Sequence, residues 1–146
     1  MPIDDAERER RRALLHAHYD VENDHDLDRI MATFSTDAEM LYNRQSFGDR
    51  ESIRTAHAYI GLSSSDGAFR GIRNVIDREH FTTDEIVVEG RLCGRHVGRH
   101  VGEFQGHSAT ERDVELPFVA FYRFDADGKL TSERVVMDLG RLAERA

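Results

Sequence analysis

The stretch LPFVAFYRFDADGKLTSERVVMD, residues 116–138, predicts two β-strands joined by a tight turn, and this hairpin decides the fold. The first strand carries apolar residues on both faces. Residues 125–128, DADG, form the turn, in which Gly128 can adopt a positive φ angle. The second strand alternates more strictly, and the alternation places Asp138 on the same face as Val136. A carboxylate at the end of a half-buried strand is costly unless it is paired, solvated or used in chemistry.

The length and charge of the chain limit its class. At 146 residues the sequence fits a single domain, residues 1–146, which is long enough to bury a hydrophobic core. The net charge of −8 argues against nucleic-acid binding, which needs a basic surface. The sequence has no run of roughly 18 consecutive apolar residues, so we expect no membrane span.

The cysteine content and the N-terminal sequence bear on the compartment. Cys93 is the single cysteine, so neither an intramolecular disulfide nor a cysteine-based zinc site can form. Residues 1–15 lack the apolar segment of a secretory signal peptide. We therefore expect a cytoplasmic protein.

The first sixty residues predict three helices. Residues 4–23 form the first, and Asp24 or Asp26 can cap the second. The third is expected to begin at Asp49 and to end at Gly61. Apolar side chains at helical spacing mark the second helix: Leu27, Ile30, Met31 and Phe34.

After the third helix the hydrophobic period changes from 3.6 to 2. Residues 72–81 and 85–104 predict two strands that precede the hairpin of residues 116–138. Residues 38–42 predict a short strand, and residues 43–48 predict a loop. Helices followed by a sheet of largely antiparallel strands indicate an α+β domain.

The long strand, residues 85–104, has two different faces. The glycines along it suggest bends, and arginines occupy one face. The other face suits the wall of a pocket and carries Leu92, His96, His100 and Phe104. We expect His100 to be the functional histidine of this face, although ordinary core hydrogen bonding remains open for both histidines.

The spacing of these two histidines does not suit a shared metal. On a strand, His96 and His100 lie ~13 Å apart, at roughly 3.3 Å per residue. A zinc–nitrogen bond is only about 2.0 Å long. We expect neither a metal nor an organic cofactor, and a metal cluster assembled from residues distant in sequence remains the open alternative.

Asp138 has two interpretations. It can pair with Arg134 or Arg141 at the end of its strand, which is a structural role. Alternatively it faces the interior pocket, to which we assign the strand face of Val136 and Asp138, and is a general acid or base whose pKa is raised toward a working pH by that partly apolar pocket.

Aromatic and histidine side chains complete the set of site candidates. A phenol can donate a hydrogen bond to a substrate oxygen, although packing with a satisfied hydroxyl is the alternative for each tyrosine. His57, on the apolar face of the third helix, has the alternative of a buried, hydrogen-bonded histidine. The remaining substrate-binding candidates are Tyr19, Tyr42, Tyr59, His96, Phe104 and Phe121.

Four segments together resemble the SnoaL-like polyketide cyclases of the nuclear transport factor 2-like superfamily. HYDVENDHDLDRIMATFSTDAEMLY, residues 18–42, looks like the helix, acidic break, second helix and strand of that superfamily. FGDRESIR, residues 47–54, resembles the start of its third helix. GRHVGEFQG, residues 98–106, and the segment 109–142 resemble the family's G-T-H-x-G-E-F-x-G and LP-x-VAFY-x-FD-x-GKI motifs. The resemblance covers most of residues 15–142.

The resemblance implies a cone-shaped fold, in which a strongly curved, mostly antiparallel sheet packs on three N-terminal helices around a pocket. Homodimers are common in that superfamily. In the cyclases an aspartate on the last strand acts as acid and base in an intramolecular aldol ring closure, with a histidine nearby. Asp138 matches the aspartate position, and His100 matches the histidine, although Arg99 replaces the threonine of the motif.

The resemblance extends to the related ketosteroid isomerases, with which this chain agrees at one catalytic position and differs at another. Those enzymes place a tyrosine on the first helix, where this chain has Tyr19. Their catalytic aspartate ends the first strand, where this chain has Tyr42 and Asn43. Neither residue is a carboxylate, which argues against steroid isomerisation.

Two functional hypotheses follow. The leading one is a small-molecule enzyme with cyclase- or isomerase-type acid–base chemistry on an apolar or aromatic carbonyl compound. The alternative is a non-catalytic ligand-binding protein or dimeric scaffold of the same fold. An ion pair between Asp138 and an arginine, together with a pocket filled by side chains, would decide between them for the alternative. In either case we expect a homodimer through the outer face of the sheet.

Overall fold

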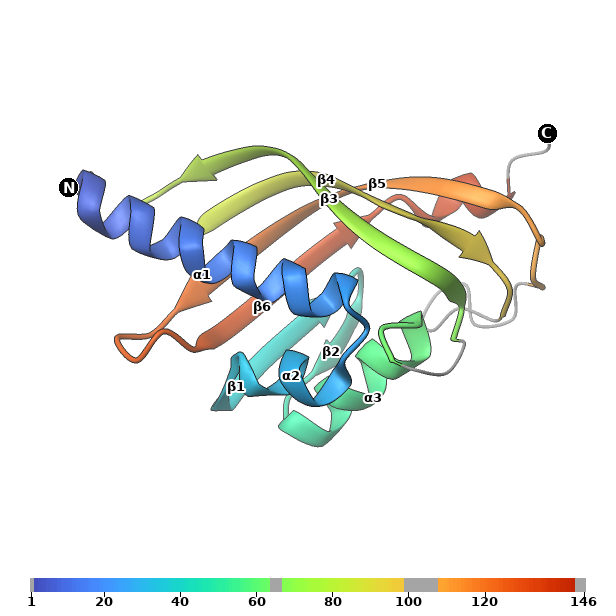
Figure 1. Ribbon diagram of the computed structural model, residues 1–146, viewed down its shortest axis with the longest axis horizontal. Helices are drawn as coiled ribbons and strands as arrows, with labels where there is room; N and C mark the ends of the chain where they lie inside the picture. Colours follow the sequence, from blue (N-terminus) through green and yellow to red (C-terminus); the bar gives the residue numbers. More distant parts are fainter. Residues whose placement is uncertain (1, 64–66, 99–107, 144–146) are drawn as a thin grey trace.

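The computed structural model describes residues 2–63, 67–98 and 108–143, and within these residues the fold is a curved sheet with helices packed on one face (Figure 1). The predicted α+β class is confirmed. Helix α1 packs along β3, and α3 packs on β1 and β2. The curved sheet and these helices enclose the hydrophobic core.

The described part of the chain contains three α-helices: α1 (Asp5–Asn23), α2 (Leu27–Ala32) and α3 (Arg50–Ile60). Each begins after an aspartate whose side chain accepts a hydrogen bond from a backbone N–H three residues later, and these caps are Asp4, Asp26 and Asp49. None of these helices combines the length and the apolar character that crossing a membrane requires.

The described strands are β1 (Phe34–Tyr42), β2 (Gln45–Phe47), β3 (Phe69–Phe81), β4 (Ile86–His96), β5 (Asp113–Phe124) and β6 (Leu130–Met137), and a 3-10 helix, η2 (Leu139–Ala143), follows. They form one sheet in the order β2-β1-β6-β5-β4-β3. Each neighbouring pair is antiparallel except β1 and β6, which are parallel.

Two predicted boundaries near the start of the sheet were wrong. Phe34 belongs to β1 and not to the second helix, because its side chain is buried in the core at the point where β1 pairs with Leu130 of β6. Residues 45–47, expected in a loop, form β2 and pair with β1. Both differences arise from strand pairing, which tertiary contacts supply and local periodicity does not.

The face assigned to the hairpin's second strand was also wrong. In β6 the side chains of Glu133, Val135 and Met137 are buried, whereas those of Arg134 and Val136 point outward. Asp138 follows on the outer side. Val135 and Val136 are adjacent valines, so alternation alone leaves two possible faces. The helices cover the face that carries Glu133, and this packing determines which face of β6 is buried.

The two-faced character predicted for the long strand is confirmed within β4. Leu92 and His96 are buried toward the interior, and Arg91 and Arg95 lie on the other face. Gly90 is placed where the pairing of β3 with β4 shifts register next to Ile76. A Cβ atom at Gly90 would lie 2.5 Å from the Val75 backbone oxygen and 2.7 Å from the ring of Phe118. The close approach of these strands therefore requires glycine.

We expect Gly90→Ala to destabilise the fold by about 1–3 kcal/mol, because the added methyl group overpacks the sheet against Val75 and Phe118. Gly48→Ala is the matched control, since no atom of the described residues lies within 4 Å of a Cβ placed there. Urea unfolding of both variants checks the expectation. Equal unfolding free energies for the two variants would contradict it.

Candidate functional site

An interior cavity lies between the helices and the covered face of the sheet. Its polar lining includes Tyr19, Glu22, His57, Tyr122 and Glu133, and its apolar lining includes Met40 and Met137. About 40 Å³ of free space remains within it. That volume suits a few water molecules or a very small ligand unless side chains move.

Two phenols meet on one wall of this cavity. Tyr19 on α1 and Tyr122 on β5 have their hydroxyl oxygens 2.7 Å apart, so one hydroxyl donates a hydrogen bond to the other. Burial raises the pKa of both Tyr19 and Tyr122 well above the ordinary value. Both therefore stay protonated, and the accepting hydroxyl keeps a hydrogen that it can donate to a further oxygen.

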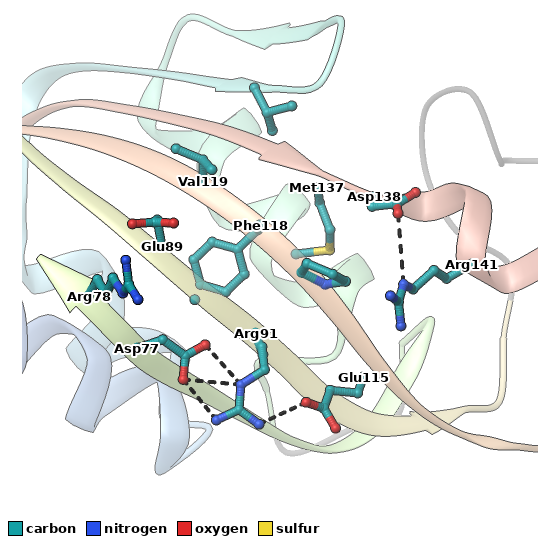
Figure 2. Close-up of a pocket in the computed structure, with 13 residues that line it drawn as sticks. Asp77, Arg78, Glu89, Arg91, Glu115, Phe118, Val119, Met137, Asp138 and Arg141 are labelled. Atoms are coloured by element: carbon teal, nitrogen blue, oxygen red, sulfur yellow. Dashed lines mark hydrogen bonds and ion pairs between the residues drawn. The ribbon is translucent and has the colours of Figure 1, made fainter.

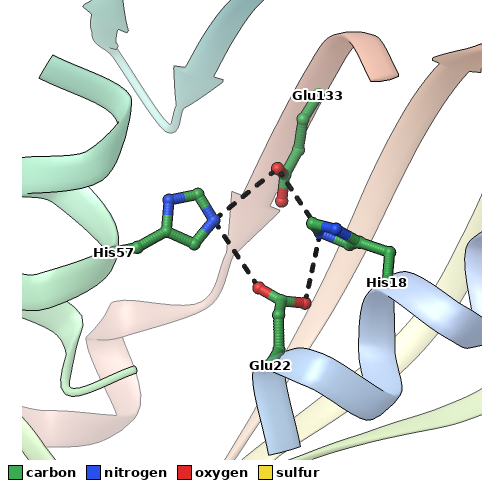
Figure 3. Close-up of side chains that lie close together, drawn as sticks. All are labelled: His18, Glu22, His57 and Glu133. Atoms are coloured by element: carbon green, nitrogen blue, oxygen red, sulfur yellow. Dashed lines mark ion pairs between the residues drawn. The ribbon is translucent and has the colours of Figure 1, made fainter. Parts of the chain in front are cut away.

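Beside the phenols lies a cluster of four buried ionisable side chains from three elements: His18 and Glu22 of α1, His57 of α3 and Glu133 of β6 (Figure 3). Their ligand-type atoms all lie within 4.8 Å of one another. The Nε2 atom of His18 lies 3.5 Å from Glu22 Oε1, and that of His57 lies 3.6 Å from Glu22 Oε2. Each of these Nε2 atoms lies 3.9 Å from Glu133 Oε2.

The tautomers of both histidines follow from their outer hydrogen bonds. The hydroxyl of Thr33 donates to the backbone oxygen of Ile30, so at 2.7 Å it accepts from Nδ1–H of His18. His57 donates its Nδ1–H to the backbone oxygen of Ile53 at 2.8 Å. In both neutral rings Nε2 thus presents a lone pair to the carboxylates.

Burial sets the charge of the cluster. It lowers the pKa of His18 to about 3, with a smaller contribution from His57, and it also lowers the pKa of His57. Burial raises the pKa of Glu133 to about 8, and burial together with the charge of Glu133 raises the pKa of Glu22. Near neutral pH the histidines are therefore uncharged, and the two carboxyl groups hold protons more tightly than exposed carboxyls do.

The same four side chains are also the group in the described chain that could hold a metal ion. Imidazole nitrogens and carboxylate oxygens are ligands of zinc and related transition metals. The sequence carried a signal for half of this set, since His18 and Glu22 lie at i and i+4 and so share one face of α1. Tyr122 and Glu133 were missed because the hairpin was assigned to the opposite face.

The outer face of the sheet has a wider hollow of about 630 Å³, shown in Figure 2. Arg91, which lines it, pairs with Asp77 at 2.9 Å and with Glu115 at 2.8 Å. Asp138 also lines this hollow, with a side chain that is 57% exposed, and it pairs with Nε of Arg141 at 3.8 Å. The expectation that Asp138 faces the interior pocket was therefore wrong.

The other predicted site residues divide between the two sides of the sheet. Tyr19, Tyr42 and His57 line the interior cavity. Phe121 lies on the outer face, where the guanidinium carbon of Arg134 is 4.5 Å from the centre of the Phe121 ring. The prediction that Phe121 lines the pocket therefore placed it on the wrong face.

Four further candidates lie elsewhere. Tyr59 is 58% exposed on α3. His96 is buried against Phe69, and its Nδ1 accepts from the backbone N–H of Thr110 at 3.1 Å. His100 and Phe104 lie outside the described residues.

Comparison with known proteins agrees with this architecture. A family model described as a SnoaL-like domain matches residues 15–133. A solved structure from Jannaschia sp. CCS1, assigned to the SnoaL-like polyketide cyclases, gives a TM-score of 0.75 at 18% identity over 92% of this chain and 89% of that one. No curated protein matches the chain significantly.

Two further solved structures have the same fold at lower identity. A protein with a ketosteroid isomerase-like fold from Catenulispora acidiphila DSM 44928, in complex with trimethylamine, gives a TM-score of 0.70 at 13% identity over 88% of each chain. The epoxide hydrolase/cyclase-like enzyme SalBIII, which acts in pyran ring formation in the polyether salinomycin, gives 0.71 at 12% identity over 91% of this chain and 94% of that one. At these identities the likeness concerns the fold alone.

The buried cluster predicts a distinctive pH dependence of stability. The lowered pKa of His18 gives a contribution that is present above about pH 6.5 and is lost as the pH falls toward 3. The raised pKa of Glu133 gives a contribution that is present below about pH 4.5 and is lost as the pH rises through 8. Between about pH 4.5 and 6.5 the two contributions change in opposite directions and cancel. In chelator-treated buffer we therefore expect the unfolding free energy to be level in this range and to fall below about pH 4.5 and above about pH 6.5.

Glu133→Gln isolates the alkaline side of this profile. Glutamine does not titrate, so we expect the loss of unfolding free energy between pH 6.5 and 8, roughly 1–2 kcal/mol in the parent, to shrink in the variant. Urea unfolding at the two pH values measures the difference. Glu39→Gln, an exposed substitution, should keep the parental slope; a parental slope in Glu133→Gln would contradict the assignment.

Proposed function

Because the chain belongs to the SnoaL-like domain family, we propose that it is a small-molecule enzyme that performs acid–base chemistry on a carbonyl compound in its interior cavity. One observation carries the proposal. Tyr122 and Glu133 are directly opposite each other on β5 and β6 and line the same cavity, and the hydroxyl of Tyr19 lies 2.7 Å from that of Tyr122. A proton acceptor and hydrogen-bond donors for an oxygen thus line one apolar space.

The proposed chemistry divides between these groups. In its ionised form Glu133 accepts a proton from the carbon next to a carbonyl group, and the electron pair of the broken C–H bond moves to form an enolate. The enolate oxygen accepts a hydrogen bond from the Tyr19–Tyr122 pair, which stays protonated because burial raises both pKa values. A pKa of about 8 places Glu133 near the optimum for proton transfer at neutral pH.

The fate of the enolate defines the reaction type. If the protonated Glu133 returns its proton to a different carbon, the reaction is an isomerisation. If the enolate carbon attacks a second carbonyl of the same molecule, a carbon–carbon bond forms as the C=O π bond breaks, the new alkoxide takes the proton from Glu133, and the reaction is a cyclisation. Both start from the same proton abstraction, so the first step can be tested without the natural substrate.

The size of the cavity constrains the substrate. The remaining 40 Å³ is far below the volume of a drug-sized site, so a ligand must be small or must displace side chains. Met40 and Met137 line the cavity, and unbranched methionine side chains rearrange more easily than branched ones. We therefore infer a small apolar or aromatic carbonyl compound that the cavity admits by rearrangement of these methionines.

Hydrogen–deuterium exchange tests the proposal. A panel of small cyclic and aromatic ketones in chelator-treated deuterated buffer, which keeps Glu133 metal-free, followed by NMR, reports proton abstraction next to the carbonyl. We expect Glu133→Gln to lower the catalysed exchange by a factor on the order of 10²–10⁴, since it removes the base. We expect Tyr122→Phe to lower it by about 10²–10³, since it removes an oxygen-binding donor.

Tyr59→Phe is the matched control for the phenol, because Tyr59 is exposed and does not line the cavity. It should leave the exchange rate unchanged. If Glu133→Gln and Tyr122→Phe remain folded by circular dichroism and keep the parental exchange rate, the proposed roles are wrong.

A second candidate function is a non-catalytic ligand-binding protein or dimeric scaffold. Two observations favour it: Asp138 pairs with Arg141 outside the cavity, and side chains fill most of the interior. Ketones that bind in the cavity without any catalysed exchange, in the parent protein, would select this candidate over the enzyme.

We further propose that the chain forms a symmetric homodimer through the outer face of the sheet. Val136 is 61% exposed there, next to Val119, its partner in the pairing of β5 with β6. Charged side chains of both signs surround these valines in the outer hollow, including Arg91, Glu115 and Arg141. An apolar centre with a mixed-charge rim suits a self-complementary interface.

Sedimentation velocity at micromolar concentration tests the dimer. We expect Val136→Asp to shift the chain toward monomer, because it places a charge at the apolar centre of the interface. Ala6→Asp, an exposed apolar-to-charged change on α1, is the control and should leave the dimer intact. A monomeric parent chain would overturn this proposal.

A further inference from the structure

We propose that His18, Glu22, His57 and Glu133 form a binding site for one divalent transition-metal ion, with Zn²⁺ as the best-fitting ion (Figure 3). The inference concerns metal binding by the chain alone and does not rest on the proposed reaction.

The spacing of the donor atoms matches a tetrahedral site. The shortest nitrogen–oxygen separations across the cluster lie between 3.5 and 3.9 Å, with Glu22 facing His18 through Oε1 and His57 through Oε2. One donor atom from each of the four residues lies within 4.8 Å of the other three. A tetrahedral zinc site with bonds of about 2.0–2.1 Å has ligand–ligand edges of about 3.3–3.4 Å. An ion therefore has to draw the donors together, by up to about 1.4 Å along the longest edge, to bring all four to bonding distance.

The direction of the lone pairs is set before any ion binds. Nδ1–H of His18 is held by the Thr33 hydroxyl, and Nδ1–H of His57 is held by the backbone oxygen of Ile53. Histidines that ligate metals almost always donate the other ring N–H to an outer acceptor in this way, which fixes the tautomer. Here both Nε2 atoms are fixed as electron-pair donors toward the carboxylates.

Charge compensation also favours a cation. Among the described residues, the ion-pair partners of Glu22 and Glu133 are His18 and His57. Burial disfavours the charged form of each histidine, so the rings compensate poorly for two buried carboxylates. A divalent ion balances both carboxylates and leaves a neutral site.

Two donor atoms lack hydrogen-bond partners within the described part of the chain: Nε2 of His18 and Oε2 of Glu133. Both side chains are at least nine-tenths buried, and both atoms face the centre of the cluster. Protons on the carboxyls would be an alternative occupant, yet separations of 3.5–3.9 Å are long for such hydrogen bonds. An ion at the centre satisfies all four groups at once.

The donor types select the class of metal. Calcium and magnesium prefer oxygen ligands throughout, whereas two imidazole nitrogens with two carboxylates suit Zn²⁺ and neighbouring transition metals. The donors lie on α1, α3 and β6, and the i, i+4 spacing of His18 and Glu22 holds two of them on one helix face. These regular elements supply a rigid frame for the site.

Cobalt substitution tests the proposal directly. The untagged chain is treated with a chelator, dialysed and titrated with Co²⁺ and Zn²⁺, with visible absorption and isothermal calorimetry as readouts. We expect one ion per chain, tetrahedral Co²⁺ bands that Zn²⁺ abolishes, and a higher melting temperature with metal than with chelator.

Variants assign the ion to the four residues. Glu22→Gln is nearly isosteric and removes one anionic ligand, so we expect affinity to fall by on the order of 100-fold. Thr33→Val keeps every ligand but removes the acceptor for His18 Nδ1–H, and we expect a loss of about 10-fold. Glu89→Gln is the matched control, since Glu89 pairs with His80 on the surface and should not alter binding.

Two results would overturn the inference. One is the absence of stoichiometric binding at micromolar metal by the folded parent chain, judged by circular dichroism. The other is unchanged affinity in Glu22→Gln and Thr33→Val, which would place the ion elsewhere. Tyr122→Phe, which keeps all four ligands, should still bind metal while losing ketone exchange, so failure of this inference and failure of the proposed reaction are distinguishable.

Discussion

Four ionisable side chains are buried where α1, α3 and β6 meet, and the interior of the fold is arranged around them. Burying such groups is costly unless each finds a partner. His18 and His57 meet part of this cost through Thr33 and the backbone of Ile53, which fix both rings. Glu22 and Glu133 have only these rings as ion-pair partners among the described residues. The two carboxylates therefore favour the binding of protons or of a cation, because the hydrophobic core around them offers no compensating charge.

The sheet separates this interior from a differently built outer surface. Along β5 and β6 successive side chains alternate between the two sides, so Tyr122 and Glu133 enter the cavity while Phe121 and Arg134 stack outside. The outer hollow is held by exposed ion pairs, which contribute little each because water screens them. The interior groups act in a low-dielectric space, where the same kinds of charge have much larger effects on pKa values and on binding.

Membership of the SnoaL-like domain family gives the fold, and the chemistry must come from the site. In this chain the strand-end aspartate, Asp138, is exposed and paired with Arg141. Among the described residues, the buried carboxyls belong instead to Glu22 on the first helix and Glu133 within the last strand. The phenol pair of Tyr19 and Tyr122 lies beside them. Any activity in this cavity therefore depends on residues other than Asp138, the residue that matches the family's strand-end aspartate.

The sequence by itself determined the α+β class, the helix starts near Asp4 and at Asp49, and the turn at residues 125–128, whereas it left Asp24 and Asp26 both open as the cap of the second helix. These features follow from local hydrogen bonds, local periodicity and the conformational freedom of Gly128, whose φ angle is 80°. Only the tertiary structure decided which face of β6 is buried, because adjacent Val135 and Val136 satisfy either alternation until the helices cover one side. It alone also decided that His18, Glu22, His57 and Glu133 meet. Their proximity depends on how α1 and α3 pack on the sheet, and no local pattern encodes the distance between elements so far apart in the chain.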